Sequence, residues 1–313
     1  MTAEDLRSLD LLVLFGDHHE TVSTHTIPEA TAMTRITLNI FDVTRLRAVA
    51  IATVLFLAFT PLAAQDFQKG YDAYTAGDYA TAFQEWMPLA EAGDASAQTN
   101  LGYMYRSGYG VPQEYAEADR WYRLAADQGN ADAQTNLGVM YRTGDGVPQD
   151  YAEAVRLYRL AADQGTALAQ ANLGVMHKNG YGVPQDYAEA VRFYRLAADQ
   201  GHAGAQTNLG YMYNNGYGVP QEYAEAARWY RLAADQGNDL AQFNLGYMYE
   251  NGEGVLQDNV MAHMWYNIGA ANGDELGGTN RDSIAEGMTP QAIVQAQAMA
   301  RDCMSSGYQN CGY

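Results

Sequence analysis

Cysteine is almost absent from this chain, because Cys303 and Cys311 are its only two and both lie in the last eleven residues. Two thiolates, with no other ligand among the residues between them, are too few for a structural metal site. In an exported chain, an even number of cysteines close together near a terminus is typical of a disulfide. The sequence therefore predicts a Cys303–Cys311 disulfide that clamps the C-terminal end.

Basic residues are also scarce, with 18 Lys and Arg against 37 Asp and Glu and a net charge of −19. Residues 65–313 alone carry a net charge of −16. Such a surface repels phosphate groups, which argues against binding to nucleic acid or to an anionic membrane. The charge favours either solubility or a basic partner.

Long hydrophobic runs are missing with one exception, the apolar segment Ala48–Phe59. Two arginines precede it, and a proline and two alanines follow it, as in a secretory signal. The run is too short to span a bilayer. We therefore expect residues 33–64 to be a signal peptide cleaved after Ala64, which predicts a periplasmic or secreted chain without stable membrane insertion. An uncleaved anchor is the alternative.

A signal of normal length would start at Met33, so we interpret residues 1–32 as an over-assigned start. Motifs of common catalytic sites are also missing: the chain has no H-E-x-x-H, S-x-x-K or G-x-S-x-G sequence and no phosphate-binding glycine loop. The histidines His177, His202 and His263 are far apart and lack metal-ligand spacing. The sequence predicts a non-enzyme without cofactor or metal.

What the chain has is a repeat. The pattern G-[YD]-G-V-P-Q-[DE]-Y-A-E-A-x-R-x-Y-R-L-A-A-D-Q-G begins at Gly108, Gly144, Gly180 and Gly216, always 36 residues apart. A fixed period of this length indicates an array of helical repeats. Two antiparallel helices per period cannot bury both of their faces alone, so each repeat must stack on its neighbours.

One repeat, residues 95–130, contains two stretches with apolar residues at helical spacing. Gly102 lies inside the first stretch, which suggests close approach of a neighbouring helix. Gly108 ends this helix, and we expect the second to begin at Pro112. Gly129 ends the second helix.

Five such units run from residue 95 to about residue 275. A shorter helix pair precedes them at residues 65–94, and a C-terminal helical cap follows at residues 276–313. Within this cap, Thr289 is the expected N-cap and Pro290 the first residue of a helix.

The Leu101-Gly102 pair, with Tyr105 and then Ala118 and Tyr122, resembles the tetratricopeptide signature. The period of 36 and the G-x-G-V-P-Q turn resemble the Sel-one-like repeat (SLR) family over residues 95–275. This resemblance implies an all-α fold, a right-handed α-α superhelical solenoid whose first helices line a concave face. It also implies a protein or peptide partner on that face. The last copy departs from the pattern, since leucine replaces the turn proline at residue 256.

Three sets of residues on the predicted concave face are candidate binding residues. An invariant asparagine recurs at Asn100, Asn136, Asn172, Asn208 and Asn244. A varying position holds Tyr103, Val139, Val175, Tyr211 and Tyr247. A second varying position holds Arg106, Arg142, Lys178, Asn214 and Glu250. We expect the two varying positions, and the position of Thr99, to be exposed.

Alternatives remain open for each set. The asparagines either bind a partner's backbone or tie each helix to the next repeat. The change from basic to acidic side chains either orients an extended partner, with its acidic end towards Arg106, or reflects drift at solvated positions. The turn tyrosines Tyr109, Tyr181 and Tyr217 either are exposed and freer than the other aromatic residues to stack on sugars or a peptide, or are half-buried by packing over the turn.

These patterns predict an exported, non-enzymatic scaffold that binds protein or peptide on its concave face. One alternative is a module that binds cell-wall glycan or muropeptide through the turn tyrosines. Another is a hydrolase of wall fragments or β-lactams, an activity linked to cysteine-rich members of the resembling family. This chain lacks their cysteine pairs.

Overall fold

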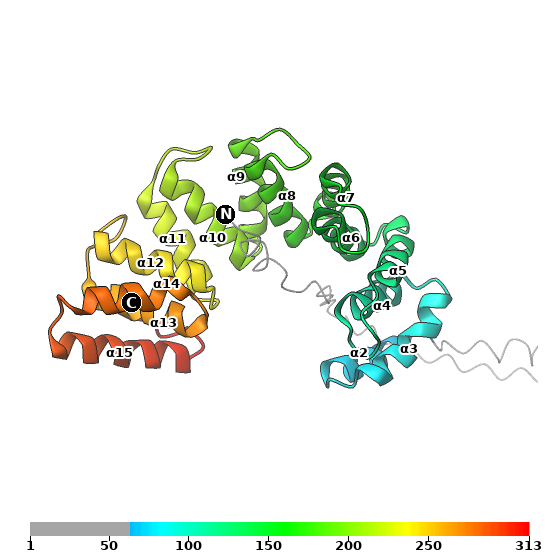
Figure 1. Ribbon diagram of the computed structural model, residues 1–313, viewed down its shortest axis with the longest axis horizontal. Helices are drawn as coiled ribbons and strands as arrows, with labels where there is room; N and C mark the ends of the chain where they lie inside the picture. Colours follow the sequence, from blue (N-terminus) through cyan, green and yellow to red (C-terminus); the bar gives the residue numbers. More distant parts are fainter. Residues whose placement is uncertain (1–62, 313) are drawn as a thin grey trace, which may run out of the picture.

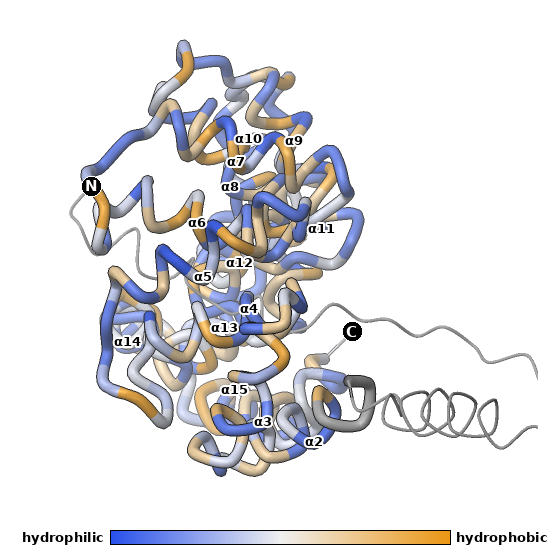
Figure 2. The backbone as a smooth tube through the Cα atoms, turned by 90° about the vertical axis from the view of Figure 1, so that its right-hand side faces the viewer, coloured by the Kyte–Doolittle hydropathy of each residue, from blue (hydrophilic) through white to orange (hydrophobic). Residues whose placement is uncertain are grey.

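The computed structural model describes residues 63–312 (Figure 1). Within this range the chain forms 14 helices and no strand, which confirms the all-α prediction. The predicted over-assigned start and almost all of the predicted signal peptide lie outside the described residues. Hydrophilic and hydrophobic residues alternate along the helices (Figure 2), and no helix in the described range is long and apolar enough to cross a membrane.

The helices follow one another in pairs along an arc, and the first helix of each repeat lies on its inner side (Figure 1). The inner helices are α2 (Ala63–Thr75), α4 (Ala95–Ser107), α6 (Ala131–Thr143), α8 (Ala167–Asn179), α10 (Ala203–Asn215) and α12 (Asp239–Asn251). The outer helices are α3 (Tyr79–Glu91), α5 (Tyr115–Asp127), α7 (Tyr151–Asp163), α9 (Tyr187–Asp199), α11 (Tyr223–Ala234) and α13 (Asn259–Asn272). Two further helices, α14 (Glu275–Ala285) and α15 (Pro290–Ser305), end the chain. From α2 to α14 each helix packs on its neighbours along the chain, which confirms an α-α solenoid.

The glycine inside each inner helix lets the outer helix of the same repeat approach closely. A Cβ at Gly102 would lie 2.6 Å from Cδ1 of Tyr122, a ring that is completely buried. The same contact recurs at Gly138 and Tyr158, Gly174 and Tyr194, Gly210 and Tyr230, and Gly246 and Tyr266. The expected close approach at this glycine is confirmed.

The outer helices begin later than the sequence suggested. We expected α5 to start at Pro112, but it starts at Tyr115. Glu114 is extended, and its N–H donates to the carbonyl of Tyr105 at 2.9 Å. The residues after the proline therefore run back along the inner helix before the outer helix can form.

Glutamine side chains join each inner helix to the preceding outer helix and to the end of the outer helix of its own repeat. Gln98 donates to the carbonyl of Ala90 in the preceding outer helix at 2.9 Å, and Gln128 donates to Oε1 of Gln98 at 2.8 Å. The second bond recurs between Gln164 and Gln134, Gln200 and Gln170, Gln236 and Gln206, and Asn272 and Gln242. Because Gln98 and its equivalents are buried, these bonds satisfy groups that would otherwise be costly.

The C-terminal cap differs from a sixth repeat. Helix α14 continues the inner row, but α15 packs on the outer face of α13. That face is apolar and buried in α13, at Met261, Met264 and Ile268. In α5 the same positions are a Glu–Arg ion pair and Leu124, which is 41% exposed.

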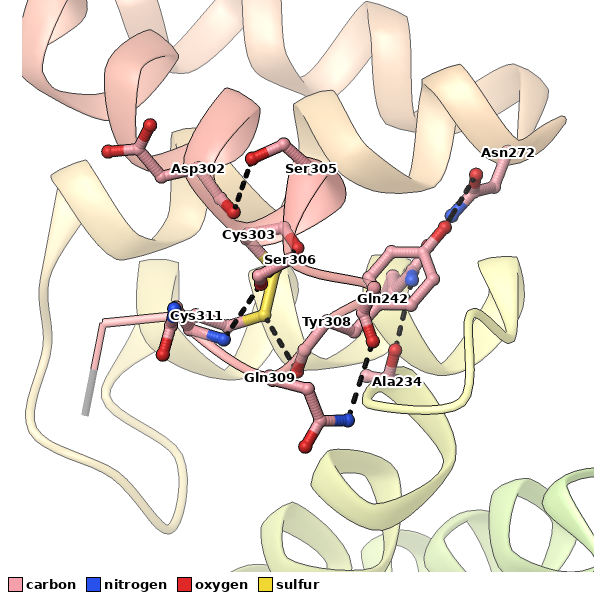
Figure 3. Close-up of a disulfide and its surroundings, with 12 residues drawn as sticks. Ala234, Gln242, Asn272, Asp302, Cys303, Ser305, Ser306, Tyr308, Gln309 and Cys311 are labelled. Carbon is pink, nitrogen blue, oxygen red and sulfur yellow. Dashed lines mark hydrogen bonds between the residues drawn. A yellow bond between two sulfur atoms is a disulfide. The ribbon is translucent and has the colours of Figure 1, made fainter.

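The disulfide between Cys303 and Cys311 forms as predicted and closes a short loop after α15 (Figure 3). Both sulfur-bearing residues are buried. The loop carries Tyr308, whose hydroxyl and the side-chain amide of Asn272 lie 2.9 Å apart (Figure 3). The clamp therefore fastens the end of the chain to the last repeat. Thr289 caps α15 as expected.

Candidate binding surface on the inner helices

The asparagine row lies on the inner helices but is less accessible than a contact surface requires. Asn100, Asn136 and Asn172 are buried, while Asn208 and Asn244 are half-buried. The side-chain amide nitrogens of Asn136 and Asn172 are buried without a hydrogen-bond partner. These two groups can still donate to a ligand that reaches them.

The hydrogen bonds between repeats come from residues outside the row formed by Asn100 and its equivalents. Thr99 Oγ1 and Asn130 Oδ1, the cap of the next inner helix, lie 3.2 Å apart. Asn208 instead donates within its own helix, to the carbonyl of Gly204 at 2.9 Å. The structure gives no support to the interpretation that these asparagines tie each inner helix to the next repeat. A role of the asparagines in binding stays a prediction.

The asparagine row has one more member, in α14, than the sequence analysis identified. Asn280 in α14 lies 36 residues after Asn244, and Ile284 takes the core position of Met248. The period alone could have revealed this member. It was missed because arginine replaces the leucine of the Leu-Gly pair at residue 281.

The side chain at the position of Tyr103 is exposed in only one of the five repeats. Val139 and Val175 are buried, and Tyr103 and Tyr211 are half-buried. Tyr247 is 43% exposed. The expectation of a uniformly exposed position is therefore wrong.

The turn tyrosines explain part of this difference. Tyr109 and Tyr217 lie 5.9 Å, between ring centroids, from Tyr103 and Tyr211. Each turn ring also stacks on the first tyrosine of the preceding outer helix, in the pairs Tyr79–Tyr109, Tyr151–Tyr181 and Tyr187–Tyr217, at 4.7, 4.9 and 5.0 Å. The turn tyrosines are thus held by packing, which favours the alternative of packing over the turn.

The position of Arg106 has contacts inside the protein. Arg106 lies 3.8 Å from the carboxylate of Asp145, and the ammonium of Lys178 lies 4.6 Å from the ring centre of Tyr211. Glu250 accepts a hydrogen bond from the hydroxyl of Tyr266 at 2.6 Å. Each of these three side chains therefore contributes to packing as well as to the charge of the face.

Some side chains at the positions of Arg106 and Thr99, which we expected to be exposed, are buried. Arg142 is buried, and so are Thr99, Thr135 and Thr207. Thr99 and Thr207 are buried because their hydroxyls donate to their own helices and face the cap of the next one. The accessible part of the inner face is narrower than predicted.

The histidines do not meet. His177 lies in α8 against Phe193, His202 caps α10, and His263 is buried in α13. Burial lowers the pKa of each of the three. Within residues 63–312 no group of His, Cys, Asp and Glu side chains could hold a metal ion.

Comparisons with known proteins agree with this architecture. A family model described as Sel1 repeat matches residues 95–130, 131–166, 167–202, 203–238 and 239–274. The solved structure of a Sel1 repeat protein from Oxalobacter formigenes is 32% identical with a TM-score of 0.66, over 76% of this chain and 97% of that one. The c5321 protein, a protective antigen present in uropathogenic Escherichia coli strains displaying an SLR fold, is 34% identical with a TM-score of 0.66. That match covers 86% of this chain and 57% of the antigen. The curated proteins contain no match.

Proposed function

Because this chain belongs to the Sel1 repeat family, whose members generally act as protein-interaction scaffolds, we propose that it is an exported, non-enzymatic scaffold that binds a protein or peptide along its inner helices. Export rests on the signal peptide expected at residues 33–64. The inner face is proposed because it combines curvature, unpartnered amide donors and residues that differ between repeats.

One observation carries the proposal: the first four repeats agree in the core and on the outer face, and the repeats differ at two positions of the inner face. The core residues Leu101, Met104 and Tyr122 recur unchanged in all five repeats. On the outer face the same Glu–Arg ion pair recurs in α5, α7, α9 and α11. The inner positions of Tyr103 and Arg106 vary instead. A surface that varies along its length can distinguish one partner from another.

The proposal is tested by crosslinking capture from an envelope extract, with the full chain as bait. The inner-face variant carries Tyr211→Val and Tyr247→Val, substitutions that the fold accommodates at Val139 and Val175. The outer-face control carries Leu196→Ala and Leu232→Ala. We expect a protein that is captured by the parent chain and the control and lost from the inner-face variant. Capture that is equal for all three would contradict an inner-face site.

The two alternative functions have separate readouts. Retention on isolated cell walls without any captured protein would favour glycan binding, although the internal stacking of the turn tyrosines gives that function less support. Turnover of a chromogenic β-lactam by the purified chain would establish a hydrolase. We expect neither result.

A further inference from the structure

A cluster of three tyrosine rings occurs twice along the inner edge of the solenoid. In each cluster a turn tyrosine stacks on the first tyrosine of the preceding outer helix and makes a tilted contact with a tyrosine of its own inner helix. The first cluster is Tyr79–Tyr109–Tyr103 and the second is Tyr187–Tyr217–Tyr211. The middle ring covers both of its neighbours.

The last repeat keeps the two flanking rings of this cluster and replaces the middle one. Tyr223 and Tyr247 occupy the flanking positions, but the turn residue is Glu253. Tyr223 is 36% exposed and Tyr247 is 43% exposed, and neither makes a ring contact with a described residue. In the register of the repeats, a carboxylate residue therefore occupies the position of the turn tyrosine.

The second repeat shows what accompanies an acidic residue at this turn. Asp145 occupies the position of Glu253, and Arg106 of the preceding repeat lies 3.8 Å from it. The residue equivalent to Arg106 for the last turn is Asn214, which carries no charge. Within the described range, Glu253 has no ion pair. The chain thus supplies a guanidinium at the first acidic turn and none at the second.

The sequence around Glu253 is acidic, which favours a cation, and two exposed leucines lie at the opposite, N-terminal ends of α12 and α14. Residues 232–280 contain seven Asp and Glu and no Lys or Arg. On the inner face of the same repeat and of α14, Leu240 is 50% exposed and Leu276 is 60% exposed. These leucines are equivalent positions of adjacent inner helices, 36 residues apart.

We propose that Tyr223, Glu253 and Tyr247 bind an arginine side chain of the protein partner. Leu240 and Leu276, at the N-terminal ends of α12 and α14, contact an apolar side chain further along the same partner segment. A planar guanidinium stacks on aromatic rings and pairs with a carboxylate at the same time, which an ammonium does less well. This inference rests on the proposed function, and it adds that the partner segment at the C-terminal end of the solenoid is basic and apolar.

Short labelled peptides test the proposal against the full chain by fluorescence anisotropy. One peptide alternates leucine and arginine, and the other has citrulline, the neutral isostere, at every arginine. We expect the arginine peptide to bind at least about tenfold more tightly, the ratio that a single charge-assisted contact supplies. Equal affinity for the two peptides would overturn the proposal.

Variants separate this site from general attraction to an acidic surface. Asn214→Arg supplies the internal guanidinium seen beside Asp145, and Glu253→Tyr supplies the missing ring. Both should abolish the preference for arginine, while Leu232→Ala on the outer face should keep it. Thermal unfolding confirms that each variant is folded. A preference that survives in the folded Asn214→Arg and Glu253→Tyr chains would contradict the assigned residues.

The capture experiment distinguishes the arginine site from the scaffold function. A protein that depends on Tyr211 and Tyr247 but is still captured by the Asn214→Arg chain would refute the arginine site and leave the scaffold function standing. Failure to capture any protein would count against the function itself.

Discussion

The ring of Tyr122 lies directly against the backbone of Gly102, so that a Cβ at this glycine would come within 2.6 Å of the ring. Gly102→Ala should lower the free energy of unfolding by about 1–3 kcal/mol, because neither the backbone nor the buried ring has room to move. Chemical denaturation measures the change. Gly278→Ala is the control, since its nearest neighbour lies at 3.9 Å, and it should be neutral or slightly stabilising. Equal losses in both variants would contradict the packing argument.

Outer helices differ in the quality of their N-terminal caps. Asp150 accepts hydrogen bonds from two backbone N–H groups, whereas Glu114 and Glu222, at the same position, make no such bond. Glu114→Asp and Glu222→Asp should each raise the free energy of unfolding by about 0.5–1 kcal/mol. The reverse change, Asp150→Glu, should lower it by a similar amount. If both directions leave the unfolding midpoint unchanged, the caps do not contribute.

His202 makes stability depend on pH. Its Nδ1 accepts the N–H of Ala205 at 3.0 Å, and burial lowers its pKa. The unfolded chain, with a pKa of about 6.5, therefore takes up a proton that the folded chain resists. The free energy of unfolding should fall as the pH decreases from about 6.5 towards the lower folded-state pKa.

His202→Asn is the matched variant, because Asn130 and Asn238 cap the equivalent helices without titrating. It should retain stability at neutral pH and reduce the decrease between neutral and mildly acidic pH, while His177 and His263, whose pKa values burial also lowers, contribute the rest. Urea unfolding at a series of pH values measures both. An unchanged slope would show that the cap histidine does not cause it.

The disulfide should stabilise the C-terminal clamp through the short loop that it closes. Reduction should lower the free energy of unfolding by about 2–3 kcal/mol in the chain-entropy account. Reductant should have no effect on a chain with Cys303→Ala and Cys311→Ala, which serves as the control. A parent chain whose unfolding midpoint is insensitive to reductant would contradict this contribution.

The sequence was informative where a local pattern determines the structure. The helix pairs, the glycine contact and the disulfide followed from local pattern. The start of α5 did not, because Glu114 bonds back to Tyr105 rather than forward into the helix. The covering of Tyr217 depends on Tyr187, 30 residues earlier in the chain. Contacts between repeats of this kind decide which inner-face residues remain accessible.

The central claim is that a partner lies along the inner helices, and site-specific photocrosslinking tests it most directly. A photoreactive phenylalanine would replace Tyr247 on the inner face and, in a second chain, Leu232 on the outer face, each expressed in the cells that naturally produce the protein. We predict a discrete protein adduct from position 247 and none from position 232. An adduct from position 232 alone would place the partner on the outer face and contradict this account.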